Sequence, residues 1–210
     1  MARPKSDLSP KIVEAARRRF LRDGVEGASL RGIAQDAGTN IGMVYYYFKT
    51  KDDLFGAVVE DVYEGLLDDL VRMLSASDVA PEQRLLGIFE RAAAFDAREL
   101  EVARLIVRET LVSSERLARV AGRFQRGHVP LMLEVIAQGT AQGRFDPGLH
   151  PAALMVATAT LAMFPQVLHH VVSAAGLPFA PFLPSRPEVA KALGQVLLFG
   201  IGGPALKDAK

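Results

Sequence analysis

The stretch that decides the fold runs from Ser29 to Lys51 and reads SLRGIAQDAGTNIGMVYYYFKTK. Its first part predicts a short helix, because Ser29 is a good capping residue and apolar residues then recur at helical spacing until Gly38. Asn40 caps a second short helix, Ile41 to Tyr47. Two short helices separated by a glycine-containing turn are the minimal helix-turn-helix, so this segment is predicted to enter a DNA groove.

The second of these helices has few residues to anchor it. Val44 and Phe48 are expected to face inward, and the three consecutive tyrosines 45–47 cannot all be buried on one helical face. Tyrosine hydroxyls donate well to phosphate oxygens, and their rings pack on sugars or thymine methyl groups. An ordinary amphipathic helical hairpin with a tyrosine-rich surface is the alternative interpretation.

Helices are also predicted on both sides of this segment. Ser9-Pro10 opens a helix that Gly24 ends as a left-handed stop. Thr50 caps a fourth helix, and Asp53 completes a Thr-x-x-Asp capping pattern. No connection shows the alternating pattern of a strand. We therefore expect an all-α protein with a three-helix helix-turn-helix headpiece and a larger helical body.

The rest of the chain also has helical periodicity from Pro81 onward. One amphipathic helix is predicted from about Ser114 to Gln142, with a bend at Pro130 and an end at Gly143. Further helices are expected at about 150–175 and 188–199, joined by a proline-rich link that cannot be helical throughout.

The composition excludes several function classes. The 210 residues include no cysteine, which excludes disulfides, thiolate zinc sites and cysteine nucleophiles. The sequence has no HExxH, no GxSxG and no phosphate-binding glycine loop. We therefore expect no enzyme activity, no metal and no cofactor. The first twenty residues lack the apolar region of a secretory signal, so a cytoplasmic protein is expected.

Charge is distributed unevenly. The formal net charge is +1, but ten Lys and Arg and five Asp and Glu lie in residues 1–51, against fifteen and nineteen in the remainder. This asymmetry is typical of a chain whose N-terminal part meets a polyanion. A solvated basic helix face would produce the same count.

The segment from Pro147 to Ser185 contains no Asp, Glu, Lys or Arg. It is long enough for a membrane span, but Pro165, Gln166 and the pair His169-His170 argue against one. A helix buried against a partner subunit is the favoured interpretation, and burial within one chain is the alternative. The predicted interface residues are Leu161, Phe164, Leu168, Val171, Leu193, Val196, Leu197 and Gly200.

Together the N-terminal motifs resemble the TetR family of bacterial transcriptional regulators. The matching pattern is A15-A16-x-x-x-F20-x-x-x-G24, then I33-A34-x-x-A37-G38, then G42-x-x-Y45-x-Y47-F48-x-x-K51-x-x-L54. The resemblance covers about residues 9–58 without interruption. Beyond these residues the chain resembles the family only in length and helical character.

The resemblance implies a homodimeric repressor that places its third helices in successive major grooves of a palindromic DNA operator. It divides the chain into a DNA-binding domain, residues 1–50, and a regulatory, ligand-binding and dimerisation domain, residues 51–210. Ile41, Met43 and Tyr47 depart from the family pattern and leave fewer side-chain hydrogen bonds for the bases. The residues predicted to bind DNA are Ser29, Arg31, Asn40, Ile41, Gly42, Met43, Tyr45, Tyr46, Tyr47, Lys49 and Lys51.

The resemblance also implies that a small, apolar effector binds the helical body and releases the DNA. Candidate pocket residues are Phe89, Phe95, Arg104, Arg108, Phe124, His128, Met132, Met163 and Phe164. Plain core packing is the alternative for each apolar residue, and a solvated face is the alternative for the two arginines. A helical protein that binds a membrane surface or another partner through the uncharged stretch is the rival function.

Overall fold

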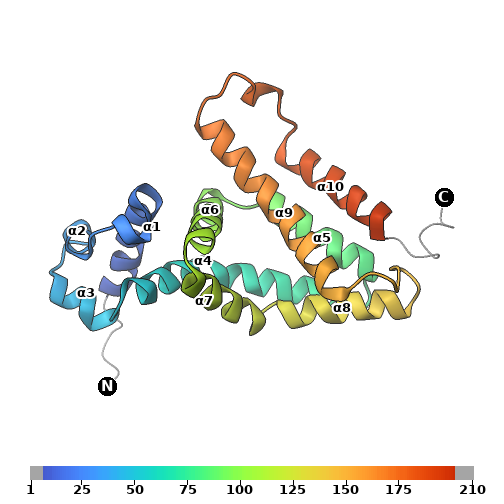
Figure 1. Cartoon of the computed structure of the whole chain (residues 1–210), viewed down its shortest axis with the longest axis horizontal. Coiled ribbons are helices and arrows are strands. Elements are labelled where there is room, and N and C mark those ends of the chain that lie inside the picture. Colours follow the sequence, from blue (N-terminus) through green and yellow to red (C-terminus); the bar gives the residue numbers. More distant parts are fainter. Residues whose placement is uncertain (1–6, 202–210) are drawn as a thin grey trace. The chain divides into compact units, whose positions relative to one another are not determined.

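The computed structural model describes residues 7–201, with side-chain surroundings up to residue 198, and these residues form an α-helical protein (Figure 1). The helices are α1 (Leu8–Gly27), α2 (Leu30–Asp36), α3 (Ile41–Tyr47), α4 (Lys51–Leu74), α5 (Pro81–Ala93), α6 (Ala97–Val112), α7 (Ser114–Gln125), α8 (Val129–Ala141), α9 (Pro151–Ala174) and α10 (Arg186–Ile201), with a 3-10 turn η1 (Ala180–Phe182) before α10. The predicted all-α class, with an N-terminal helix-turn-helix and a larger helical body, is confirmed.

Local capping explains why the N-terminal helices begin where they do. The Ser29 hydroxyl accepts from the amide of Gly32, and the Asn40 side chain accepts from the amide of Met43 at 3.1 Å. At α4 the Thr50 hydroxyl accepts from the Asp53 amide, while the Asp53 carboxylate accepts from the Thr50 amide, both at 3.0 Å. Each bond satisfies an amide that a helix start leaves without a partner.

Gly24 has the left-handed conformation that the sequence predicts, with a φ of 78°. The helical hydrogen bonds resume after it, so α1 extends to Gly27 across a kink. Gly24 therefore interrupts the helix where the sequence predicts an end, and a short helical segment to Gly27 follows the kink.

The chain forms two compact units. The N-terminal unit comprises the residues up to Gly65 together with Glu101–Arg123, and the C-terminal unit comprises Leu66–Leu100 together with the residues from Phe124 onward. Helices α4, α6 and α7 each contribute to both units. The predicted domain division at residue 50 stays a prediction.

The N-terminal unit has a core made by residues from several helices. Ile12, Phe20, Ile33, Val44 and Phe55 are fully buried. Arg19 of α1 forms a bidentate ion pair with Asp36 at the end of α2, with nitrogen–oxygen distances of 2.6 and 2.9 Å. Apolar packing and this ion pair together fix α2 against α1.

In the C-terminal unit α5 packs against α8, α9 and α10, and α9 also packs against α8 and α10 (Figure 1). Its buried side chains include Leu85, Phe89, Met132, Ile136 and Phe145. Gly139 allows the ring of Phe145 to lie directly against α8, because a Cβ there would stand 2.2 Å from a ring carbon. The core of this unit is thus mostly apolar.

Two predictions for the body are wrong. The stretch 114–142 is not one bent helix but two, α7 and α8, which residues 126–128 separate. Pro130 lies in the first turn of α8, where a residue without an N–H costs no hydrogen bond, so it marks a helix start instead of a bend.

The uncharged stretch forms α9, the proline-rich link and η1. Among the described residues, α9 is long and apolar enough in composition to cross a membrane, and 28% of its most apolar window is buried in the structure. The side chains of Val156, Phe164 and Leu168 on this helix are largely exposed. Packing within the described residues therefore leaves part of the apolar surface of α9 exposed.

Candidate nucleic-acid interface

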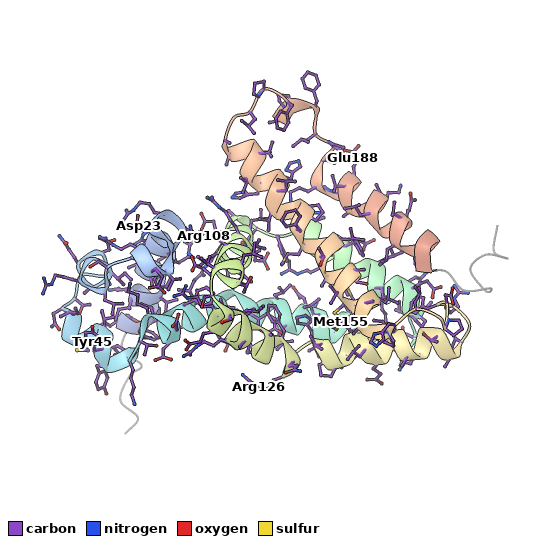
Figure 2. The ribbon with its side chains drawn as sticks, viewed as in Figure 1. Asp23, Tyr45, Arg108, Arg126, Met155 and Glu188 are labelled. Atoms are coloured by element: carbon purple, nitrogen blue, oxygen red, sulfur yellow. The ribbon has the colours of Figure 1, made fainter. Side chains whose placement is uncertain are left out.

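Helix α3 presents most of its side chains to solvent. Within Ile41–Tyr47, Val44 is fully buried, whereas Tyr45 is 51% and Tyr46 74% exposed. Figure 2 labels Tyr45 on this helix. Tyr47 is half-buried, and its ring meets that of Tyr46 edge to face with centroids 5.2 Å apart. A helix anchored through one buried side chain, with its aromatic residues outside, has the form of a groove-entering helix.

The predicted DNA-binding residues lie along one continuous segment, from the start of α2 through α3 to the start of α4. Arg31, Asn40, Gly42 and Lys49 are exposed, and Ile41 and Met43 are half-buried. Ser29 and Asn40 use their side-chain oxygens to cap α2 and α3. Asn40 therefore has a structural task, and its amide nitrogen is the part that remains for DNA.

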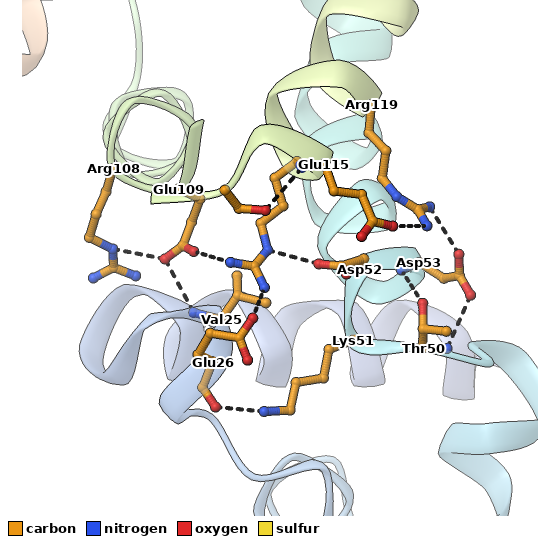
Figure 3. A network of polar contacts seen from close by, with 12 residues as sticks. Val25, Glu26, Thr50, Lys51, Asp52, Asp53, Arg108, Glu109, Glu115 and Arg119 are labelled. Carbon is orange, nitrogen blue, oxygen red and sulfur yellow. Dashed lines mark hydrogen bonds and ion pairs between the residues drawn. The ribbon is translucent and has the colours of Figure 1, made fainter. Parts of the chain in front are cut away.

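Lys51 has a second role that the sequence does not indicate. Its ammonium group donates to the backbone carbonyl of Glu26, at a nitrogen–oxygen distance of 2.6 Å (Figure 3). This bond joins the first residue of α4 to the last turn of α1. An ammonium has three donors, so Lys51 can hold this carbonyl and still face a phosphate.

Behind α2 and α3 lies a group of charged side chains, supplied by α1, α4, α6 and α7 (Figure 3). Arg116 of α7 donates to Asp52 at 2.8 Å and to Glu109 at 2.9 Å, and it also pairs with Glu26. Arg119 pairs with Asp53 at 3.1 Å. Thr50 and Arg119 hold the pKa of the Asp53 carboxyl below its usual range, with the Thr50 hydrogen bond as the larger cause.

Two candidate pocket residues, Arg104 and Arg108, belong to the N-terminal unit. Arg104 is exposed, and Arg108 is already engaged, since its guanidinium donates to the carbonyls of Phe20 and Leu21 and to Glu109. The hydrogen bonds of Arg108 thus link α6 to α1. An anionic ligand at Arg108 would have to replace these bonds.

The other candidate pocket residues belong to the C-terminal unit. Phe89, Phe95 and Met132 are buried, and Phe124 and His128 form a ring pair with centroids 5.1 Å apart. Met163 is half-buried, and Phe164 is 46% exposed.

A groove of about 520 Å³ lies between α5 and α10, and of the candidates only Phe89, among the described residues, lines it. Sequence reasoning missed the remaining lining residues, because the pairing of α5 with α10 leaves no local signal. They are Leu86, Glu90, Ala93, Ala94, Pro187, Ala190, Lys191 and Gln195.

Sequence reasoning did not single out Gln166 as a ligand residue either. This side chain of α9 is fully buried, and its amide nitrogen has no hydrogen-bond partner in the described structure. Its amide oxygen lies 3.3 Å from the guanidinium of Arg186, which also donates to the carbonyls of Ala92 and Phe95. A buried donor without a partner is costly, so it marks a polar position inside an apolar core.

The predicted interface residues on α9 and α10 divide into two groups. Phe164, Leu168 and Val196 are exposed, at 46, 51 and 61%. Leu161, Val171 and Leu193 are half-buried, whereas Leu197 is buried within the chain. Gly200 lies near the end of α10, outside the residues whose surroundings the structure describes.

Comparison with known proteins supports the assignment of the N-terminal unit. Residues 12–58 match the family model described as bacterial regulatory proteins, tetR family. The probable HTH-type transcriptional regulator YttP of Bacillus subtilis is 25% identical over 142 residues, which cover 67% of this chain and 69% of that protein. The HTH-type transcriptional repressor KstR2 of Mycobacterium tuberculosis is 28% identical over 146 residues, which cover 66% of this chain and 70% of that protein.

Among solved structures, the transcriptional regulator FadR of Bacillus subtilis in complex with stearoyl-CoA superposes with a TM-score of 0.72. It is 16% identical, and the alignment covers 91% of this chain and 98% of FadR. At this identity the similarity shows the fold. The helix-turn-helix region of this chain, residues 12–58, therefore matches the tetR family of bacterial regulatory proteins, and the chain shares its fold with a transcriptional regulator of known structure.

Proposed function

We propose that the chain acts in the cytoplasm as a homodimeric repressor, which leaves a palindromic operator when a small apolar ligand binds its helical body. The observation that carries the DNA-binding part is the exposed face of α3, with Tyr45 and Tyr46 outside and Val44 as its buried anchor. The similarity to KstR2 supports repression rather than activation, because KstR2 is a repressor and the alignment covers 66% of this chain and 70% of that protein.

The residues of the interface divide into two tasks in this proposal. Tyr45, Tyr47, Lys49 and Lys51 hold phosphates, together with Ser29, because hydroxyl and ammonium groups donate to phosphate oxygens without reading sequence. Arg31, Tyr46 and the residues Ile41–Met43 face the base edges. Asn40 supports them by capping α3. With few polar groups on α3, thymine methyl groups and DNA shape contribute much of the sequence preference.

The exposed apolar face of α9 and α10 supports the dimer. Phe164, Leu168 and Val196 would be covered by the same helices of a second copy, which would form a four-helix bundle across a two-fold axis. Two half-sites about 34–36 Å apart would then meet two copies of α3. The alternative is that α9 inserts into a membrane, which would predict detergent-dependent solubility.

The buried aromatic and methionine side chains of the C-terminal unit support an apolar effector. Phe89, Phe95 and Met132 provide apolar surface, and the unpaired amide nitrogen of Gln166 provides hydrogen-bond donors. A ligand with an apolar body and a carbonyl or hydroxyl acceptor fits this combination.

DNA selection from a random pool, followed by anisotropy titration of the selected sequence and of the DNA upstream of the gene, tests the proposal. We expect a salt-sensitive complex of two chains per palindrome. Arg31→Ala should weaken binding and relax preference at one base pair, whereas Tyr45→Ala should weaken binding to all sequences alike. Arg126→Ala, which removes an exposed charge in the link between α7 and α8, is the control. Failure to select any sequence would refute the DNA-binding proposal.

A further inference from the structure

One guanidinium holds both ends of the segment that contains α2 and α3. Arg116 pairs with Glu26, in the last turn of α1, and donates to Asp52, in the first turn of α4, at 2.8 Å (Figure 3). Residues 27–51 between these two carboxylates comprise α2, α3 and their turns. We propose that Arg116 is a positioning residue for DNA binding, which fixes the two ends of the helix-turn-helix although it lies 64 residues from Asp52 and 90 from Glu26 in the sequence.

The side chain is itself held in place. Arg116 is 4% exposed, and its third bond goes to Glu109, whose side chain is also 4% exposed, at 2.9 Å. The other oxygen of Glu109 accepts from the amide of Val25 at 3.2 Å and from Arg108 at 3.0 Å. Each charged group in this cluster therefore has at least one opposite charge, as buried ions require. Such a satisfied network fixes one geometry and not several.

Neighbouring contacts act in the same direction. Lys51 donates to the carbonyl of Glu26, so a second bond joins the end of α1 to the start of α4. Arg119, one turn after Arg116 on α7, pairs with Asp53 next to Asp52. Arg116 nevertheless differs from both in its burial and in touching α1, α4 and α6 at once.

The physical consequence concerns preorganisation. With its ends fixed, the segment 27–51 meets DNA in one arrangement and loses little conformational freedom on binding. Without Arg116 the ends of α1 and α4 can separate, and Glu109 is left buried beside one fewer cation. DNA affinity should then fall although the lost side chain touches no phosphate.

The first experiment compares Arg116→Met with the parent protein on the selected DNA, and it rests on the DNA binding proposed above. We expect affinity to fall on the order of tenfold, the size of coupling between residues that share a network. The slope of affinity against salt should stay that of the parent, because that slope counts phosphate contacts. Arg116→Lys should recover only part of the lost affinity. The ammonium keeps the positive charge but cannot match the planar geometry with which the guanidinium meets three carboxylates.

A second variant separates positioning from simple electrostatics. The side chain of Glu26 is 81% exposed, so Glu26→Gln leaves the core intact. Removing a negative charge near DNA should by itself tighten binding. If Glu26 instead serves to hold Arg116, Glu26→Gln should bind DNA several-fold more weakly than the parent. The matched control is Asp23→Asn one turn earlier on α1, whose carboxylate pairs with Arg22 outside the cluster and which should not weaken binding.

Hydrogen exchange of the free protein provides a test that needs no DNA. Amides of residues 27–50 should exchange faster in Arg116→Met and Glu26→Gln, while those of α8 and α9 keep their protection. Unchanged exchange in this segment, or Glu26→Gln binding as tightly as Asp23→Asn, overturns the proposal. If the parent binds no DNA but exchange responds as expected, the proposed function fails, whereas the role of Arg116 in fixing residues 27–51 stands.

Discussion

The Arg116 cluster in the N-terminal unit and helix α9 in the C-terminal unit contrast in their chemistry. In the N-terminal unit charged side chains join elements far apart in the sequence, as Arg116 does with Glu26 and Asp52. The C-terminal unit contains α9, which has no charged residue and leaves Phe164 and Leu168 exposed. The charges of the Arg116 cluster are thus paired within the chain, whereas α9 has apolar surface left to cover.

The largest effect should come from placing a charge on that uncovered surface. Leu168→Arg puts a guanidinium on the 51% exposed face of α9, and a two-fold interface would bring two of them together. We expect a monomer by sedimentation and a loss of operator affinity of more than about 100-fold, since the two headpieces then bind singly. Gln142→Arg, at the exposed end of α8, is the control for added charge. A Leu168→Arg protein that still sediments as the parent's dimer would refute the proposed interface.

Substitutions at two glycines test how much room each unit has for an added methyl group. A Cβ at Gly139 would meet the buried ring of Phe145, whereas a Cβ at Gly32 would meet the flexible end of Arg19. Gly139→Ala should lower the free energy of unfolding by about 1–3 kcal/mol, the cost of overpacking. Gly32→Ala should be nearly neutral, because the helical gain from alanine offsets the loss of an exposed ion pair. Urea unfolding measures both variants, and equal losses would contradict the contrast.

The sequence predicted the N-terminal helices closely, because their limits depend on neighbouring residues. The caps at Ser29, Asn40 and Thr50 and the stop at Gly38 act within one turn, and α3 has the predicted bounds. The exposure of Tyr45 and Tyr46 follows from the same local periodicity. The roles of these residues toward DNA remain predictions.

The sequence could not predict contacts that depend on long-range folding. Arg116 lies 90 residues from Glu26, and nothing near either residue indicates their pairing. The groove between α5 and α10 was missed for the same reason, because it is lined by residues that lie far apart in the sequence. The break before α8 was missed for a different reason, since a proline in a helical pattern is compatible with a bend or with a first turn.

The caps at the start of α4 and of α10 offer a smaller comparison. Thr50 accepts from the Asp53 amide and also donates its own amide to that carboxylate, whereas the Ser185 hydroxyl donates to Glu188, which also accepts the Ser185 amide. Thr50→Ala loses the bond to a helix amide and should cost about 1 kcal/mol of stability. Ser185→Ala keeps the amide bond to Glu188 and should cost less. Thermal unfolding checks the order, and a larger loss at Ser185 would reverse it.

The smallest effect is the acid dependence of the same α4 cap. Because Thr50 and Arg119 lower the folded-state pKa of Asp53, its stabilising contribution is complete above the unfolded-state value near 3.8 and is lost as pH falls through the folded value. The stability difference between the parent and Thr50→Ala should therefore stay constant from pH 7 to about pH 5 and narrow below about pH 4. Arg119→Met removes the ion pair at Asp53. The stability difference between the parent and Arg119→Met should therefore also narrow over the same pH range. Urea unfolding at each pH measures both, and a difference that widens in acid would mean that the cap works through groups other than the ionised Asp53.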